Sequence, residues 1–250
     1  MFYHIIASGS KGNCTYISNK DTRILIDMGI SLVRLKSGLA EIGQKVSDIE
    51  GILYTHEHSD HISGFRFISP KKSYATEGTA PSTLCNIVEY NVSFDIGSFK
   101  ITPFQTSHDA KKPCGYVIED NESKLVYMTD TGVFLESNLP LLENPDYLII
   151  ESNHDMGMLM GSNRPMILKQ RIKSDFGHLC NEDSAFATSK IIGTRTKEIV
   201  LAHLSEECNT EEHALNAYKD IFSYLNINLD LYNIKCAKQW ESISGGNNEN

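Results

Sequence analysis

The stretch GILYTHEHSDHISG, residues 51–64, decides how the rest of this sequence is interpreted. It opens on the apolar run GILY, which is typical of a buried strand. Three histidines and two carboxylates then follow within six residues, from His56 to His61. Titratable groups crowded at the end of a buried strand cost stability unless a ligand draws them together, and imidazole with carboxylate is a donor set that divalent ions select. The stretch therefore predicts a metal site.

The spacing within this cluster predicts two ion positions. His56 and His58 are two residues apart on extended chain, so their rings leave the same side. Asp60 and His61 come next, where the chain turns into a helix, and there they face a second position. A solvated polar loop that is rich in histidine is the alternative interpretation, but imidazole and carboxylate at this density favour two adjacent divalent ions.

Three later apolar runs also end in a side chain that can bind a metal. His108 closes ITPFQTSH, Asp130 closes LVYMTD and His203 closes IVLAH. A lone histidine at a strand end is more often structural. Together with the first cluster, however, the pattern H-x-H-x-D-H followed by H, D and H supplies seven ligands, which is enough for two sites with open positions for water.

Composition limits the classes of function. The 250 residues are 40% hydrophobic and carry a formal net charge of -9, which fits one large globular domain and argues against a non-specific nucleic-acid coat. The six cysteines form no C-x-x-C pair, the N-terminus lacks a secretory leader, and no run of 18 apolar residues occurs. We therefore expect reduced thiols, a cytoplasmic location and no membrane partner.

The remaining pattern is one of short strands alternating with helices, an α/β organisation. Leu32, Leu35 and Leu39 share one helical face between a capping Ser31 and a terminating Gly43. One domain is expected over residues 1–243, followed by a flexible polar tail over residues 244–250. Further helices are predicted in the second half of KKSYATEGTAPSTLCNIV and at Asn163–Asp175, Asn181–Gly193 and Thr210–Tyr224.

THEHSDH, followed by the three later ligands, resembles the metallo-β-lactamase superfamily. The resemblance implies an αββα sandwich, in which two facing mixed sheets are flanked by helices and a dinuclear site lies at one edge. It implies that His56, His58 and His108 hold the first ion, that Asp60, His61 and His203 hold the second, and that Asp130 bridges the two. The metal stays open between zinc and manganese.

The branch of the superfamily is indicated by two further features. Lactam hydrolases usually have cysteine at the fourth ligand position. This sequence has aspartate there, and in this respect it resembles the branches that hydrolyse phosphodiesters or thioesters. In the nuclease branches an acidic residue pairs with a histidine to protonate the leaving oxygen, and Glu151 in IESNHD and His178 in GHLCNEDSA match that pair. A surface acid and an ordinary helix-start histidine are the alternative. His154 either lines the site or is structural.

The opening loop SGSKGN adds backbone N–H groups that can meet a phosphate. With the other motifs it resembles the YycJ group (also called WalJ or VicX) of single-domain 5′-exonucleases, which implies DNA with a 5′ end as the substrate. Cys180 departs from the group's GHLS motif, which usually has serine there. The candidate substrate contacts are Ser10, Asn13, His154 and Arg164.

The expected reaction is metal-assisted hydrolysis of a phosphodiester in DNA or RNA. A hydroxide held between two ions and oriented by Asp60 attacks phosphorus, while His178, positioned by Glu151, protonates the leaving oxygen. The alternatives are a small-molecule phosphodiesterase similar to the PhnP group, a thioesterase-type metallo-hydrolase, and a non-catalytic interaction module.

Overall fold

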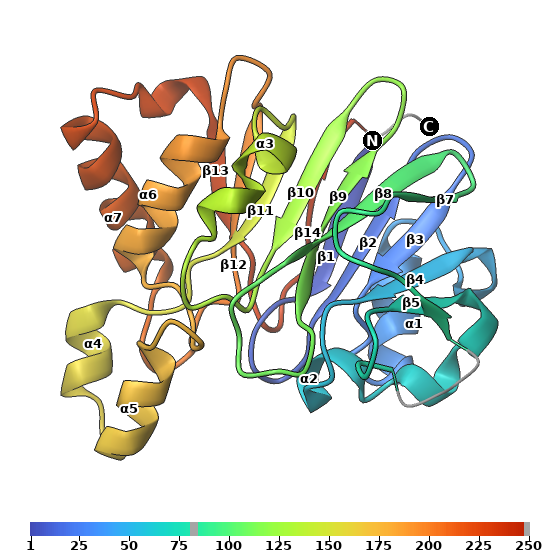
Figure 1. Cartoon of the computed structure of the whole chain (residues 1–250), viewed down its shortest axis with the longest axis horizontal. Helices are drawn as coiled ribbons and strands as arrows, with labels where there is room; N and C mark the ends of the chain where they lie inside the picture. The colour runs from blue at the N-terminus through green and yellow to red at the C-terminus, as the bar shows by residue number, and fades with distance from the viewer. Residues whose placement is uncertain (81–84, 248–250) are drawn as a thin grey trace.

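Two seven-stranded sheets packed face to face form the centre of the computed structural model, which describes residues 1–80 and 85–247 (Figure 1). The first sheet has the order β14-β1-β2-β3-β4-β5-β6, and the second has the order β13-β12-β11-β10-β9-β8-β7. Each sheet is mixed, because antiparallel pairs give way to parallel pairs at β3–β4 and at β10–β11. The αββα sandwich implied by the resemblance is therefore confirmed.

Most strands fall where the apolar runs predict them, but β6 lies in the stretch that was predicted to be a helix, of which residues 81–84 are outside the described residues. The first sheet contains β1 (Phe2–Ala7), β2 (Cys14–Ser18), β3 (Arg23–Ile26), β4 (Gly51–Tyr54), β5 (Ser73–Ala75), β6 (Asn86–Ile87) and β14 (Ile243–Gly246). The second contains β7 (Phe94–Ile96), β8 (Phe99–Gln105), β9 (Cys114–Glu119), β10 (Lys124–Met128), β11 (Tyr147–Glu151), β12 (Glu198–Ala202) and β13 (Asn233–Cys236).

Strand β4 shows how the layers are built. Leu53 packs into the core between the two sheets, whereas Ile52 and Tyr54 pack into the core under the outer helix of the first sheet. Successive side chains of a strand point to opposite faces, so a strand buried on both faces has an apolar residue at every position. This explains why the run before the histidine cluster does not alternate.

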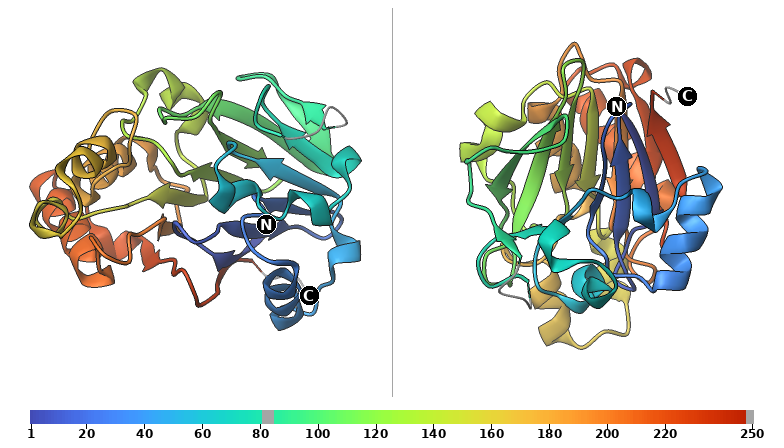
Figure 2. Two further views of the ribbon diagram at one scale, coloured as in Figure 1. Left: turned by 90° about the horizontal axis from the view of Figure 1, so that it is seen from below. Right: turned by 90° about the vertical axis from the view of Figure 1, so that its right-hand side faces the viewer.

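Helices cover the outer faces of both sheets (Figures 1 and 2). α1 lies against the first sheet, α6 and α7 pack on the second, and α4 and α5 project beyond the sheets at the lower left of Figure 1. The helices are α1 (Leu32–Glu41), α2 (Ser59–Ile62), α3 (Leu139–Leu142), α4 (Met156–Gly161), α5 (Met166–Ile172), α6 (Asn181–Ile191) and α7 (Glu211–Tyr224).

Capping residues set several of these boundaries. The side chain of Ser31 accepts a hydrogen bond from the N–H of Arg34, and that of Thr210 accepts one from the N–H of His213, as expected for N-caps. Helix α5 is shorter than the predicted Asn163–Asp175, because Pro165 at its N-cap disfavours helical geometry in the residue before it. Within the described residues, every helix is too short or too polar to cross a lipid bilayer.

The predicted flexible tail requires a correction. Ser244–Gly246 belong to β14, which pairs antiparallel with β1, and the N–H of Asn247 donates to the carbonyl of Met1. The small, polar composition of this segment reveals nothing about a backbone partner that lies 240 residues away. The end of the tail, residues 248–250, lies outside the described residues.

Candidate metal centre

The side chains of the candidate site come from the carboxyl ends of neighbouring strands. β10, β11 and β12 are parallel, so Asp130, Glu151 and His203 reach the same edge of the second sheet. His108 follows β8, and the His56–His61 segment follows β4 of the facing sheet. The edge where the two sheets face each other therefore collects all the strand-end ligands predicted from the sequence.

Two of these residues, Asp130 and His203, have an unusual backbone conformation, and so does Asp27, which was not predicted as part of the site. Asp27 (φ 60°), Asp130 (φ 55°) and His203 (φ 56°) all adopt the left-handed region, which few residues other than glycine occupy. Each directly follows or nearly follows a strand, at β3, β10 and β12. Such conformations cost about 1–3 kcal/mol each and persist where the surrounding structure over-determines them, as at functional sites.

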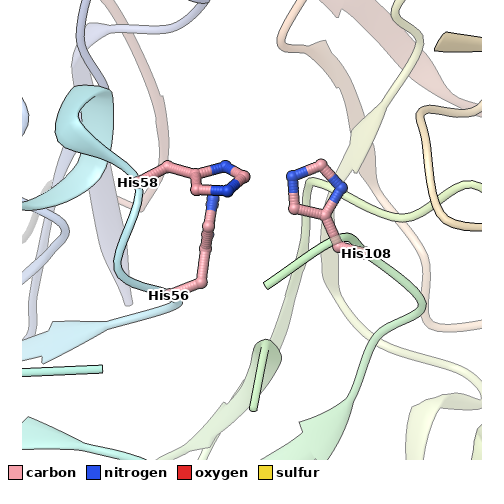
Figure 3. Close-up of side chains that lie close together, drawn as sticks. All are labelled: His56, His58 and His108. Carbon is pink, nitrogen blue, oxygen red and sulfur yellow. The ribbon is translucent and has the colours of Figure 1, made fainter. Parts of the chain in front are cut away.

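The first set of donors consists of three imidazoles. His56, His58 and His108 each offer a ring nitrogen, and these atoms lie within 4.8 Å of one another. Figure 3 shows the rings of His56 and His58 on one segment and the ring of His108 on the facing one, converging on a common point. The ring centroid of His108 lies 5.0 Å from the centroid of each of the other two.

The second set adds carboxylates. Asp60, His61 and His203 also offer atoms within 4.8 Å of one another. Asp130 lies between the two sets: its Oδ2 is 3.3 Å from His61 Nε2, and its Oδ1 is 3.6 Å from His203 Nε2 and 3.8 Å from His108 Nε2. The arrangement places one carboxylate within reach of both sets.

Hydrogen bonds on the outer side of the cluster orient the imidazoles. His61 Nδ1 lies 2.8 Å from Asp27 Oδ2, and His108 Nδ1 donates to the carbonyl of Gly177 at 2.9 Å. His203 Nδ1 lies 3.0 Å from Glu151 Oε1. An acceptor on Nδ1 fixes the ring tautomer and leaves Nε2 free to ligate, which is the usual outer arrangement of metal-binding histidines.

The inner atoms of the cluster fit a cation. Within the described residues, His56 Nε2, His203 Nε2 and Asp130 Oδ2 are buried and have no hydrogen-bond partner. Buried polar atoms in proteins are nearly always satisfied, so a cluster of unsatisfied acceptors needs an explanation. Nitrogen and oxygen donors of this kind match the preferences of zinc and manganese.

The charges of the cluster also favour a bound cation. Burial alone would raise the pKa of Asp130, but the surrounding imidazoles, His203 first, hold it well below its usual range. Burial lowers the pKa of His203, but the carboxylates of Asp130, Asp60 and Glu151 outweigh this effect and raise it to about 10. A bound cation would replace the proton that these carboxylates draw to His203.

Glu151 connects the cluster to the predicted proton donor. Its Oε1 lies 2.7 Å from His178 Nδ1 and also 3.0 Å from His203 Nδ1. Its Oε2 accepts from the backbone N–H groups of Thr131 and Leu179. These contacts overcome the burial of Glu151, which is complete, and lower the pKa of its carboxyl to about 2. The link between Glu151 and His203 was not predicted.

A cavity of about 190 Å³ opens over the donors. His178 lines it, together with two of the predicted substrate contacts, Ser10 and Arg164. Asn13 is fully buried instead, and its side-chain amide nitrogen lies 3.0 Å from His61 Nε2. Its amide oxygen accepts from the N–H of Gly9, within the same loop between β1 and β2. The structure thus brings Ser10 and Arg164 to the cavity and places Asn13 beneath it.

The other two sequence features, His154 and Cys180, lie next to each other in a parallel bridge. His154 is buried, and burial lowers the pKa of its imidazole to about 4, so the ring is neutral. Cys180 is the N-cap of α6, and its Sγ accepts from the N–H of Asp183 at 3.4 Å. A thiol therefore fills the capping position that a serine hydroxyl would also satisfy.

Asp27 is the site residue that sequence reasoning missed. Its carboxylate is fully buried and accepts from the backbone N–H and hydroxyl of Thr55 as well as binding His61. A signal was present, because TRILID is another apolar run that ends in an aspartate. Asp27 contacts a predicted ligand, His61, and does not line the cavity. Its sequence pattern is the same as that of the predicted ligands, but its position in the site is different.

Replacing Asp27 with asparagine is expected to weaken metal binding roughly 10- to 100-fold, because the carboxamide is neutral and has one acceptor oxygen to serve both Thr55 and His61, where the carboxylate has two. Chelator-competition titration with Zn²⁺ or Mn²⁺ measures the affinity, and thermal unfolding of the metal-free protein checks that the fold persists. The matched control is Asp95→Asn on the exposed side of β7, which should leave the affinity unchanged. Equal affinity for wild type and Asp27→Asn would show that Asp27 does not support the site.

Comparison with known proteins yields one family and several relatives. The model of the β-lactamase superfamily domain matches residues 22–203. Exodeoxyribonuclease WalJ of Streptococcus pneumoniae strain D39 is 40% identical over 227 residues, covering 85% of this chain and 84% of that protein. Exodeoxyribonuclease YycJ of Bacillus anthracis is 35% identical over 227 residues, covering 86% of each chain.

The fold is also similar to solved structures. The crystal structure of the metallo-β-lactamase fold protein YhfI from Bacillus subtilis aligns with a TM-score of 0.69 at 17% identity, covering 97% of this chain and 99% of that one. At this identity the likeness concerns the fold alone.

Proposed function

Because the chain belongs to the β-lactamase superfamily, we propose that it is a metal-dependent nuclease with a dinuclear site that removes nucleotides from the 5′ end of DNA. The relatives named as exodeoxyribonucleases match most of the chain, which supports a nucleic-acid substrate. All six cysteines are free, which supports the proposal that the protein works in a reducing, cytoplasmic environment.

The observation that carries the proposal is the pair of Glu151 and His178 beside the donor cluster. The ring centroid of His178 lies 5.0 Å from that of His108 and 5.3 Å from that of His203, so a proton donor stands next to both donor sets. Its ring lines the cavity, whereas Glu151 is fully buried behind it. A phosphodiester needs such a donor, because its leaving alkoxide is a poor leaving group without a proton.

We assign the candidate ligands as two sets that share Asp130. His56, His58 and His108 would hold one ion, and Asp60, His61 and His203 would hold the other. When bound, the ions supply Lewis acidity toward a phosphate oxygen and lower the pKa of a water molecule. The imidazole-rich set suits zinc, and the carboxylates also suit manganese.

The residues of the chain then orient the reactants and move the proton. The Asp60 carboxylate is partly exposed to the cavity, where it can orient the attacking water by accepting its hydrogen bond. Glu151 accepts the Nδ1–H of His178 and balances the charge of its imidazolium form, whose Nε2–H gives its proton to the leaving oxygen as the P–O bond breaks. Because the same oxygen of Glu151 also contacts His203, the proton donor is fixed relative to the donor cluster.

Two arginines on the far wall of the cavity are candidates for binding phosphate. Arg164, just before α5, and Arg171, within it, both line the cavity. Arg164 pairs with Glu207 at 2.9 Å and Arg171 pairs with Asp109 at 2.5 Å, each through Nε, so that the guanidinium is held in place while its terminal nitrogens can still donate to a phosphate. Arginine suits phosphate because its planar donors match two phosphate oxygens at once.

Substrate comparison tests this function. The protein is incubated with Mn²⁺ and, separately, with a 5′-phosphorylated DNA strand, the same strand as RNA, bis-p-nitrophenyl phosphate and a thioester. We expect stepwise release of nucleotides from the 5′ end of the DNA, abolished by EDTA. Hydrolysis of the small diester alone would favour a small-molecule phosphodiesterase, hydrolysis of the thioester alone would favour a thioesterase, and no hydrolysis at all would favour an interaction module.

A further inference from the structure

Trp240, the single tryptophan of the sequence, lies beside the candidate metal centre with 63% of its side chain exposed. It follows β13 and lines a second cavity together with Ser205 and Glu206. Ser205 also lines the cavity over the donors, two residues after His203. The two cavities therefore adjoin, and the indole stands at the rim of the candidate site.

The indole is held in a defined position. Its Nε1 donates to Glu206 Oε1 at 2.7 Å, and Glu206 in turn pairs with Lys11 at 2.6 Å. The preceding Gln239 accepts from the N–H of Lys11 and donates to the carbonyl of Gly12. Trp240 is thus fastened to both loops that border the site, one after β1 and one after β12, although its ring remains largely open to solvent.

A fixed cation supports the ring. The guanidinium carbon of Arg34 lies 4.8 Å from the centroid of the indole, and Arg34 donates to the carbonyls of Ile6 and Gln239. Arg34 is half-buried, whereas the indole is largely exposed. Lys11 Nζ, which pairs with Glu206, lies 5.5 Å from the same centroid. With Trp240 63% exposed, much of the ring remains open to solvent beside these two cations.

We propose that Trp240 is a stacking platform for an unpaired base of a single-stranded end whose phosphate lies at the donor cluster. The inference rests on the proposed nuclease function and extends it to the kind of substrate that the rim accepts. Aromatic side chains bind single strands in this way because every base has a π-face. The cations Lys11 and Lys238 at the rim are paired with Glu206, Glu211 and Glu241, so the contact here is with a base rather than a phosphate.

The single tryptophan makes the contact directly observable. Metal-free protein in EDTA, which cannot cleave, is titrated with single-stranded oligothymidylate and, separately, with a blunt duplex of the same length, while tryptophan fluorescence is recorded. We expect saturable quenching by the single strand and little change with the duplex. If the single strand binds, as measured by the anisotropy of a labelled oligonucleotide, without altering the fluorescence, Trp240 does not stack on it.

Substitutions then measure the effect on turnover. Trp240→Ala should raise the KM for long single strands about tenfold with little change in kcat, and Trp240→Phe should restore part of the loss. The effect should be smaller on a dinucleotide, which has fewer bases to offer the ring. Tyr224→Ala, at another exposed aromatic residue, at the end of α7, is the control that should leave KM and kcat unchanged.

The outcomes separate this inference from the proposed function. Wild-type protein that degrades single-stranded DNA, while Trp240→Ala shows the same KM, overturns the platform and leaves the nuclease function standing. Equal losses on the dinucleotide and on long strands show a structural role for Trp240 and also overturn it. Wild-type protein that neither binds nor cleaves any oligonucleotide overturns both.

Discussion

Replacing Asp60 with alanine is expected to lower the rate of DNA hydrolysis on the order of 10³-fold or more while leaving the fold intact. The Asp60 carboxylate lies 3.4 Å from His61 Nε2 and 3.8 Å from His203 Nε2, and it lines the cavity. Its loss removes a donor for one ion and the group that orients the water.

The fold should survive this change because the structural contacts of Asp60 are made by its backbone. Its carbonyl accepts from the N–H of Asn13 at 2.8 Å, and the short helix α2, in whose first turn Asp60 lies, has no side-chain cap that depends on this carboxylate. Circular dichroism and thermal unfolding check the fold, and a nuclease assay at saturating Mn²⁺ measures the rate. The matched control is Asp95→Ala, at an exposed residue of β7, for which we expect wild-type rates. Near-normal metal-dependent cleavage by Asp60→Ala would refute the site assignment.

Replacing His178 with alanine should slow the cleavage of DNA roughly 10²- to 10⁴-fold without releasing metal. The reason is that His178 carries the proton for the leaving oxygen, held by Glu151 at 2.7 Å, and is not one of the seven proposed ligands. The loss should be far smaller on bis-p-nitrophenyl phosphate, because p-nitrophenolate leaves without needing a proton. Rates on both substrates, together with the metal content of the purified variant, test this expectation.

The metal content is decisive for this variant because His178 also lies within 4.8 Å of donor atoms of Asp130, Glu151 and His203. Loss of an ion from His178→Ala would show that its imidazole is a ligand, and equal loss of rate on both substrates would show that it acts before the leaving group departs. His213→Ala, an exposed histidine at the start of α7, serves as the matched control.

The sequence was most informative where local pattern and long-range structure coincide. Apolar runs that end in His108, Asp130 and His203 predicted strand ends, and parallel pairing of β10, β11 and β12 brings such ends to one edge. The resemblance of the His56–His61 segment to the metallo-β-lactamase superfamily implied the sandwich, in which the edges of the two sheets face each other. Sheet order itself depends on hydrogen bonds between distant strands, which no local pattern records.

Contacts that depend on this long-range geometry were the ones missed. Asp27 ends an apolar run like the ligands, but only the pairing of β3 with β4 shows that it lies behind His61 rather than in front of it. Glu151 was expected to orient His178, and its second contact with His203 follows from the register of β11 with β12. The pairing of β14 with β1 was hidden for the same reason.

The central claim is that the strand ends of two facing sheets hold two divalent ions at seven side chains. Elemental analysis of protein saturated with Zn²⁺ or Mn²⁺ and dialysed against metal-free buffer tests it most directly. The account predicts about two ions per chain for wild type, and fewer for variants that lack Asp130, whose carboxylate lies between the two donor sets. Protein that is offered metal freely and retains only trace amounts would contradict it.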